Sequence, residues 1–380
     1  MVEPVHSRGG PLTGVRVVDF GVGGVGPFGA TLLGWLGADV VKVEAPNEFI
    51  LTVRPTAGGI STTYLALNQG KRSVALDLKN ARDHELARAL VEQADVVVEN
   101  FRPGALDRLG FGFSDVASVN PRIVYCSATG FGSRGPLANE ICTDPHMQAF
   151  SGFAQLNADE SGVPRRVRYY GFVDLVTSCV IAEAICAGLL ARRRSGGPIR
   201  IETSMLQAVS EAQQSAVEGP RLVPDDVFQA ADGYVAITCL DSSQRDRLVE
   251  LLGLPRSFAS PNPTTVARPE ADATRFRASI EQILTSRPAA AWVHLLEQAG
   301  IPCVRVLHDE DVLTRKDFWT GGVLRELPLR HAAPLVAGGP PWFLGLHVRA
   351  PMAPLPGGDT ESLRQEGKIW VSGEHPSRAT

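Results

Sequence analysis

Two aspartates stand at the start of helix-like segments, where a carboxylate can either cap a helix or do chemistry. Asp174 lies where VRYYGFVDL meets a long apolar run, and Asp144 lies in ICTDPHMQAFSG, directly before Pro145. A first-turn aspartate is usually structural and is worth about 1 kcal/mol. In an apolar setting the same carboxylate can act as a nucleophile. The local sequence leaves both interpretations open at Asp174 and favours a cap at Asp144, with Pro145 as the first helical residue.

A glycine-rich turn is the second place where the spacing of residues suggests chemistry. Gly21, Gly23 and Gly26 form a G-x-G-x-x-G pattern after an apolar run, and Glu44 ends the next such run 18 residues later. This resembles the dinucleotide fingerprint, in which the acidic residue binds a ribose hydroxyl. An NAD enzyme is therefore one hypothesis. Residues 130–135 also match the pattern in a chain with 38 glycines, so the spacing alone is weak evidence.

Polar side chains gather at two further points. Asn100 and Arg102 follow the apolar run DVVVE at its carboxyl end, which is where parallel sheets bind ligands. An ordinary loop is an equal alternative there. Lys71 and Arg72 form a small basic spot after a glycine, which suits either a phosphate or a solvated turn. Both places are candidates for contact with a polar, anionic ligand.

The elements that must position these groups follow from hydrophobic periodicity. Strands are expected at residues 15–20, 39–45, 95–101, 122–127 and 199–203, and helices at 30–38, 81–94 and 175–194. The last helix ends in three arginines, and Gly196 and Gly197 stop it. Strands that alternate with helices predict an α/β fold, with a parallel sheet covered on both faces.

The pattern changes after about residue 210, which predicts a second domain. Residues 225–325 carry expected strands at 232–238 and 301–307 and helices at 245–253 and 289–300, with a proline-rich loop at 255–270. This reads as a smaller α+β domain. Residues 326–380 are rich in proline and glycine, with a short helix at 360–366. Such a segment cannot form its own core, so we expect it to wrap over a first domain of residues 1–220.

Composition limits the class of protein. Hydrophobic residues make up 44% and charged residues 21%, and the net charge is -4, so nucleic acid is not an expected partner. No apolar run is expected to reach a membrane span of roughly 18 residues, and the N-terminus lacks the apolar stretch of a secretory signal. The six cysteines form no CxxC pair and the histidines no HxxxH pair. We therefore expect reduced thiols, a cytoplasmic protein and no metal site.

Taken together, the motifs resemble the class III CoA-transferases of the CaiB/BaiF type, a family that includes formyl-CoA transferase, carnitine CoA-transferase and α-methylacyl-CoA racemase. The matching segments occur in family order: LTGVRVVDFGVGGVGP, LGADVVKVEAP, LNQGKRSVALDL, VVVENFRPGALDRLG, SATGFGSRGP, DPHMQAFSG, VDL and LLARRRSGG. A weaker match includes DGYVAIT, GIPCVRV and GGDTESLRQ. No single segment is decisive, but the ordered set covers nearly the whole chain.

The resemblance implies a Rossmann-like large domain, a small domain and a homodimer of two interlocked chains. It also implies that CoA and acyl-CoA are substrates, a free carboxylic acid is the acceptor and no cofactor is permanently bound. The glycine loop would then lie against CoA rather than NAD. Carried over by position, the CoA and thioester contacts are Gly24, Val25, Ala45, Leu67, Asn68, Gly70, Lys71, Asn100, Phe101, Arg102, Arg108, Ile141, Cys142 and Thr143.

By the same resemblance, Asp174 takes the place of the catalytic aspartate of the transferases. Racemases of the family have a His-Asp pair where this chain has Thr143 and Asp144, so one partner of a two-base proton exchange is replaced. An acyl-CoA racemase or isomerase that uses Asp144 and Asp174 as proton shuttles is therefore the alternative hypothesis. An acyl-CoA-binding homologue without turnover is a third, and the retained Asp174 argues against it.

Three arginines close before Asp174 suggest the class of acid. Arg165, Arg166 and Arg168 could hold a second carboxylate, which would favour a dicarboxylic acyl group, although a solvated strand edge is the plainer interpretation. The sequence does not name the donor or the acceptor acid.

Overall fold

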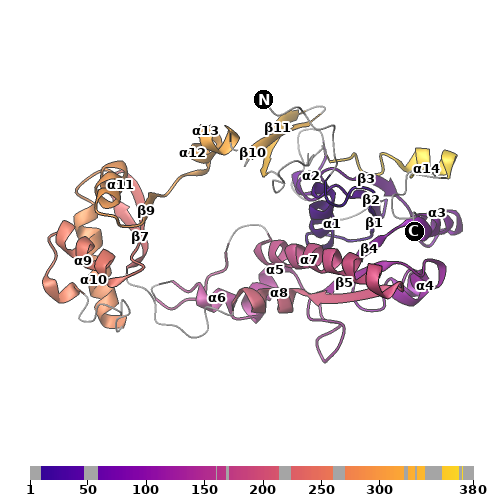
Figure 1. Ribbon diagram of the computed structural model, residues 1–380, viewed down its shortest axis with the longest axis horizontal. Coiled ribbons are helices and arrows are strands. Elements are labelled where there is room, and N and C mark those ends of the chain that lie inside the picture. The colour runs from indigo at the N-terminus through magenta and orange to yellow at the C-terminus, as the bar shows by residue number, and fades with distance from the viewer. Residues whose placement is uncertain are drawn as a thin grey trace. The chain divides into compact units, whose positions relative to one another are not determined.

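The computed structural model describes residues 10–46, 59–159, 161–167, 171–213, 224–259, 270–320, 324–329, 332–338, 353–367 and 370 (Figure 1). The chain divides into two compact units. Unit 1 comprises Met1–Gln214 and Gly321–Thr380, and unit 2 comprises Ser215–Thr320. The candidate residues for chemistry named above all belong to unit 1.

Unit 1 is built on a six-stranded sheet in the order β3-β2-β1-β4-β5-β6, in which every neighbouring pair is parallel. The strands are β1 (Arg16–Asp19), β2 (Asp39–Glu44), β3 (Arg72–Ala75), β4 (Val96–Glu99), β5 (Val124–Thr129) and β6 (Ile199–Ser204). This is the doubly wound order of nucleotide-binding folds, so the predicted α/β class is confirmed. The four-residue strand β3 was not predicted, because RSVA is too short and too polar to show as an apolar run.

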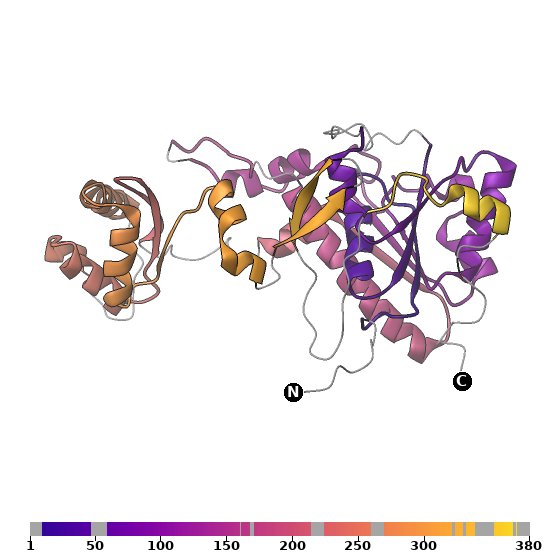
Figure 2. The same cartoon turned by 90° about the horizontal axis from the view of Figure 1, so that it is seen from above.

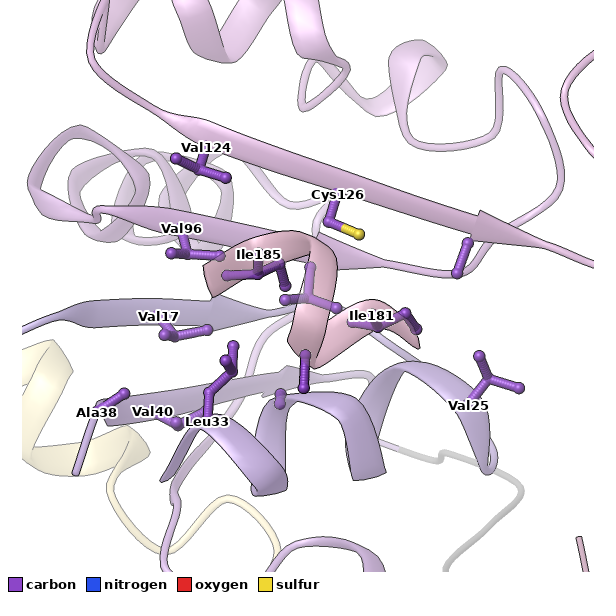
Figure 3. Packing of buried hydrophobic residues seen from close by; sticks show 14 of the residues in the cluster. Val17, Val25, Leu33, Ala38, Val40, Val96, Val124, Cys126, Ile181 and Ile185 are labelled. Atoms are coloured by element: carbon purple, nitrogen blue, oxygen red, sulfur yellow. The ribbon is translucent and has the colours of Figure 1, made fainter. Parts of the chain in front are cut away.

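Alternate side chains of β1, β2, β4 and β5 enter two separate cores. On one face, Val17, Val96 and Val124 pack with α1 (Val25–Trp35) and α7 (Phe172–Ser195), as Figure 3 shows. On the other face, residues of the same strands pack with α3 (Ala81–Gln93) and α4 (Phe113–Val119). Strands buried on both faces explain why their sequences read as continuous apolar runs.

By length and composition alone, α7 could cross a membrane. The expectation that no apolar run reaches that length is wrong, because it considered only uninterrupted runs, and Asp174 and Glu183 interrupt this one. Within unit 1, α7 is a core helix, with Ile181 and Ile185 fully buried. It lies so close to α1 that a Cβ on Gly29 would be 2.8 Å from Ile181 Cγ2.

The C-terminal segment covers the free edge of β3. The Asp359 N–H donates to Ser73 O (2.8 Å), and the Ser73 N–H donates to Asp359 Oδ2 (2.9 Å). The Ala75 N–H donates to Thr360 Oγ1 (2.8 Å). These bonds replace those that a further strand would make. We call residues 357–363 the C-terminal strap.

The strap includes the first residues of α14 (Thr360–Glu366), the yellow helix of Figures 1 and 2. This helix matches the short helix predicted at 360–366. Leu363 and Trp370 are buried in the same hydrophobic core as the apolar residues of α3. The hairpin of β10 (Leu324–Leu329) and β11 (Ala332–Gly338) was not predicted. The proline and glycine content there had suggested loop.

Unit 2 has an antiparallel three-stranded sheet in the order β7-β8-β9, formed by Asp225–Ala230, Gly233–Thr238 and Cys303–Arg305. One face packs against α9 (Ser242–Leu251), α10 (Glu270–Leu284) and α11 (Ala289–Gln298) through a core that includes Phe228 and Phe276. The helix α10 was not predicted. The remaining helices are α2 (Thr62–Leu67), α5 (Asp144–Phe150), α6 (Phe153–Leu156), α8 (Met205–Ala212), α12 (Asp309–Thr314) and α13 (Lys316–Thr320), with short 3₁₀ turns at Asp107–Leu109 and Arg256–Phe258.

Candidate active site

The glycine loop lies at the point where the strand order of the sheet reverses. It follows β1, and Asn100 follows the neighbouring strand β4. The Asn100 side chain joins the two loops: Oδ1 accepts from the Val22 N–H (2.7 Å), and Nδ2 donates to Val22 O (2.8 Å). Both ends of the Asn100 amide are thus used to hold the glycine loop in place.

The glycines of this loop are required by close contacts. A Cβ on Gly26 would lie 2.9 Å from Asn100 Oδ1, and a Cβ on Gly21 would lie 2.8 Å from Pro27 Cδ. A Cβ on Gly24 would lie 2.3 Å from Asp174 Oδ2. The loop therefore brings its backbone directly against the Asp174 carboxylate.

Asp174 is in the first turn of α7 and is only partly exposed. Burial, and in second place the nearby Asp144 carboxylate, raise the pKa of Asp174 to about 7. Ser178, one turn later, donates its hydroxyl to Val25 O (2.8 Å) and to Asp174 O (2.7 Å). The bond to Val25 O fastens the start of α7 to the start of α1.

The Asp144 carboxylate is buried and fully engaged with backbone and side-chain donors. Its Oδ2 accepts from the N–H groups of Val173 (2.6 Å) and Asp174 (3.2 Å), and its Oδ1 accepts from Gln148 Nε2 (2.6 Å). Asp144 thus binds the first turn of α7 from another helix. A carboxylate held by three donors is poorly suited to moving a proton.

Lys71 lies inside the fold, where it cannot contact a phosphate. Its ammonium donates to Asp19 Oδ2 (2.8 Å), Asn68 Oδ1 (2.8 Å) and Pro27 O (2.6 Å), and its side chain has no exposed surface. Desolvation lowers the pKa of Lys71 to about 8 despite the nearby Asp19 carboxylate. The carry-over of Lys71 as a CoA contact therefore disagrees with the geometry, because the buried Asp19 attracts its charge inward.

Glu44 is likewise engaged inside the protein. Its Oε1 accepts from the Tyr64 hydroxyl (3.2 Å), from the Ser73 hydroxyl and from the Gly357 N–H of the C-terminal strap (3.0 Å). Only 3% of Glu44 is exposed. The dinucleotide hypothesis thus lacks an accessible acidic residue for the ribose.

The other carried-over positions fall into three groups by exposure. Exposed residues are Ala45, Arg102, Arg108, Ile141 and Thr143, and partly buried ones are Gly24, Leu67, Gly70, Asn100, Phe101 and Cys142. Asn68 and Val25 are buried. The Asn68 side chain accepts from the Lys71 ammonium through Oδ1 and donates to Tyr64 O through Nδ2 (3.0 Å). Arg102 and Arg108, which follow β4, remain the exposed cations of the set.

The arginines before Asp174 do not form one cluster among the described residues. Arg165 pairs with Asp159 (2.7 Å) on the surface, Arg166 is exposed, and Arg168 lies outside the described residues. Thr143 Oγ1 hydrogen-bonds His146 Nδ1 (3.0 Å). Within the described ranges, no group of three or more His, Cys, Asp or Glu side chains is placed to hold a metal ion.

Three residues of the site were missed from the sequence: Asp19, Gln148 and Ser178. Gln148 follows Asp144 by four residues, and Ser178 follows Asp174 by four, which is the spacing of neighbours on one helix face. That spacing was the available signal. Asp19 is separated from Lys71 by 52 residues, and no local pattern relates them.

A doubly wound sheet with a glycine loop at the point where the strand order reverses is typical of α/β proteins that bind nucleotides, and here a partly buried carboxylate lies beside that loop. The sequence matches CoA-transferase family III over residues 12–360, so the chain belongs to that family and is a CoA-transferase. It is 34% identical over 310 residues to the acetyl-CoA:oxalate CoA-transferase of Acetobacter aceti, which covers 77% of this chain and 80% of that protein.

Two further comparisons agree. The succinyl-CoA:glutarate CoA-transferase of Mus musculus is 31% identical over 339 residues, covering 83% of this chain and 77% of that protein. The crystal structure of a CaiB/BaiF family protein from Brucella suis aligns with a TM-score of 0.81 at 27% identity, covering 95% of this chain and all of that one. The family named by the resemblance is thereby confirmed.

Proposed function

We propose that this enzyme moves CoA from an acyl-CoA thioester to a free carboxylic acid, with Asp174 as the nucleophile. The observation that carries the proposal is the partly buried Asp174 carboxylate, which lies against the Gly24 backbone with its pKa raised to about 7. A desolvated carboxylate is a stronger nucleophile than one in water, and near neutral pH a large fraction of it is ionised.

The reaction proceeds by four acyl transfers. An Asp174 oxygen attacks the thioester carbonyl carbon, the C–S bond breaks, and a mixed anhydride and CoA thiolate form. The thiolate attacks the aspartyl carbonyl, which gives an aspartyl-CoA thioester and releases the donor acid. The acceptor carboxylate attacks this thioester, forms a second anhydride and again releases the thiolate. The thiolate then takes the acceptor acyl group, and the Asp174 carboxylate is regenerated.

The glycine loop is suited to stabilising the oxyanions of these steps. The first turn of α1 has backbone N–H groups without intrahelical acceptors, and the helix dipole favours negative charge there. We place the thioester at Gly24, Val25, Cys142 and Thr143, and the CoA phosphates near Arg102 and Arg108. In this proposal the buried Lys71 and Asn68 and the partly buried Asn100 support the loop.

The domain arrangement is part of the same proposal. Residues 1–220 and 326–380 form the CoA-binding large domain, residues 225–325 form the small domain, and two chains interlock as a homodimer in the cytoplasm. The division of the chain into units at residues 214/215 and 320/321 supports this arrangement.

We further propose that one of the two acids is a dicarboxylic acid. The relatives from Acetobacter aceti and Mus musculus are named for oxalate and glutarate. Arg165 is paired with Asp159, so Arg166, which is exposed, is the described arginine of the three that we propose for the second carboxylate. Arg168 belongs to the same hypothesis by sequence.

Mass spectrometry of the enzyme mixed with acetyl-CoA or succinyl-CoA, and quenched with hydroxylamine, tests the nucleophile. We expect a hydroxamate on the peptide that carries Asp174, and transfer of CoA to oxalate or glutarate in the same mixture. If Asp174 stays unmodified with these donors while the α-hydrogen of an acyl-CoA exchanges with deuterated water, the isomerase alternative replaces the proposal. The three bonds that hold Asp144 argue against that outcome.

Replacing Gly24 by alanine is expected to lower the transfer rate by about 100-fold or more, because displacing a reacting group by an ångström has effects of that order. The backbone of Gly24 is right-handed (φ -91°), so the added methyl strains no dihedral angle and acts only on the Asp174 carboxylate 2.3 Å away. Steady-state kinetics measure the effect. Gly197→Ala, at a position with open space around it, is the matched control; equal rates for both variants would contradict the geometry.

A further inference from the structure

The first turn of α7 is capped by a residue from another helix. The residue before α7 is Gly171, which has no side chain to cap the helix, and Asp174 is the acidic residue of the first turn. A first-turn aspartate normally turns toward the N-terminal N–H groups of its own helix. Here the buried Asp144 occupies them, with Oδ2 bonded to the N–H groups of Val173 and Asp174.

We propose that Asp144 is a positioning residue that takes the capping role from Asp174 and so leaves the Asp174 carboxylate available for the acyl group. This inference rests on the proposed function and deepens it. It replaces the hypothesis that Asp144 is a proton shuttle with a different role for the same carboxylate.

Gln148 holds Asp144 in this arrangement from the opposite side. Its Nε2 donates to Asp144 Oδ1 (2.6 Å), and its Oε1 accepts from the Val167 N–H (2.9 Å). A third segment of chain is thereby tied to the two helices α5 and α7. With both carboxylate oxygens fixed, Asp144 cannot rotate away from the helix, and the Asp174 backbone is held at one position relative to the glycine loop.

The charge of Asp144 acts on Asp174 in a second way. Burial is the larger cause of the raised pKa of Asp174, and the nearby Asp144 carboxylate raises it further, because two carboxylates close together resist simultaneous ionisation. Among the described residues, the thiol of Cys142 also interacts with this pair. Burial, and then the carboxylates of Asp174 and Asp144, raise its pKa to about 11, so the thiol is neutral near pH 7. The helix α1, with sequence VGPFGATLLGW, carries no ionisable side chain.

Two substitutions at position 144 separate the hydrogen bonds that cap α7 from the negative charge of the carboxylate. Asp144→Asn keeps an oxygen that can accept the two N–H bonds but removes the negative charge. Asp144→Ala removes both, so the Asp174 carboxylate is expected to turn back onto its own helix. Asp241→Asn is the matched control, because Asp241 caps α9 of unit 2 by accepting from the Gln244 N–H (2.8 Å).

The first readout is the titration of Asp174 itself, followed by NMR on protein labelled with ¹³C at aspartate carboxyl carbons. The Asp174 signal is assigned by its loss in Asp174→Asn. We expect it to titrate near pH 7 in the original protein and in Asp241→Asn, and at clearly lower pH in Asp144→Asn. An unchanged midpoint in Asp144→Asn would overturn the electrostatic part of the inference, and this readout requires no substrate.

The second readout is the pH profile of kcat for CoA transfer from succinyl-CoA to glutarate. For Asp144→Asn we expect the acidic limb to move to lower pH with kcat reduced by roughly tenfold, and for Asp144→Ala a loss on the order of 10²-fold. Equal kcat values for Asp144→Ala and Asp241→Asn would overturn the positioning role. If the original protein transfers no CoA while the titration of Asp174 shifts in Asp144→Asn as expected, the proposed function is wrong. The inference that Asp144 caps α7 and acts on Asp174 then still holds.

Discussion

Replacing Asp174 by asparagine is expected to abolish CoA transfer, by at least about 10³-fold, because the first covalent bond of the proposed reaction forms on this carboxylate. Asparagine has nearly the same shape, so the contact with Gly24 and the binding of CoA are expected to persist. Transfer from succinyl-CoA to glutarate measures the first effect, and calorimetric titration with CoA measures the second. Glu92→Gln, which removes an exposed carboxylate of α3, is the control; transfer by Asp174→Asn within tenfold of that control would disprove the nucleophile.

The same variant is expected to be more stable than the original protein at alkaline pH. The folded-state pKa of Asp174 is about 7, above the ordinary value of about 4. The stability that this group contributes is therefore fully present below about pH 4 and is lost as pH rises through about 7. The advantage of asparagine should approach about 4 kcal/mol above pH 8. Urea unfolding at pH 5 and pH 8.5 measures it, and a difference independent of pH would contradict the raised pKa.

Replacing Lys71 by methionine is expected to lower the free energy of unfolding by roughly 3–5 kcal/mol. The substitution leaves the Asp19 carboxylate buried without its counter-charge, and it removes the donor to Asn68 and to Pro27 O. Urea unfolding at neutral pH measures the loss. The double variant Asp19→Asn/Lys71→Met is expected to recover part of it, because no charge is then left unpaired.

Arg72→Met provides a control at the neighbouring position. It removes the same charge, but the Arg72 pair with Asp39 (2.6 Å) is partly exposed, with 31% and 48% of the two side chains accessible. Solvent screens such a pair, so we expect a loss of under about 1 kcal/mol. If Lys71→Met is no more costly than Arg72→Met, the buried cluster does not support the glycine loop as described.

The sheet could largely be predicted from the sequence because its strands are buried on both faces. Runs such as VRVVDF and DVVVE have one structural explanation in a chain of alternating elements, and α7 is marked at its end by Gly196, whose φ of +71° suits glycine. The strand β3 and the hairpin β10–β11 had no comparable signal. The strand β3 has only four residues, two of them polar, and β10 and β11 each contain a proline, which argues against a strand. Pairing with neighbouring chain, rather than local sequence, makes them strands.

The site could be predicted where its residues are close in sequence, or where a glycine allows close contact. Gly24 and Asp174 were both singled out, and the structure brings them together. Sequence could not show which way a charged or polar side chain points. Lys71 looked like a ligand contact because it forms a basic spot after a glycine, and Asn100 because it follows a strand. In the structure, Lys71 turns toward Asp19, 52 residues away, and Asn100 toward Val22, 78 residues away.

The C-terminal strap also has a consequence for the order in which the protein is made. Leu363 and Trp370 belong to the core of unit 1, so the ribosome delivers all of unit 2 before the last residues of that core. Until residues 357–370 emerge, β3 is a bare edge strand that can pair with another nascent chain. The core of unit 1 can therefore be completed only after unit 2 has been synthesised, and a ribosome that stalls after residue 320 leaves the edge of β3 uncovered.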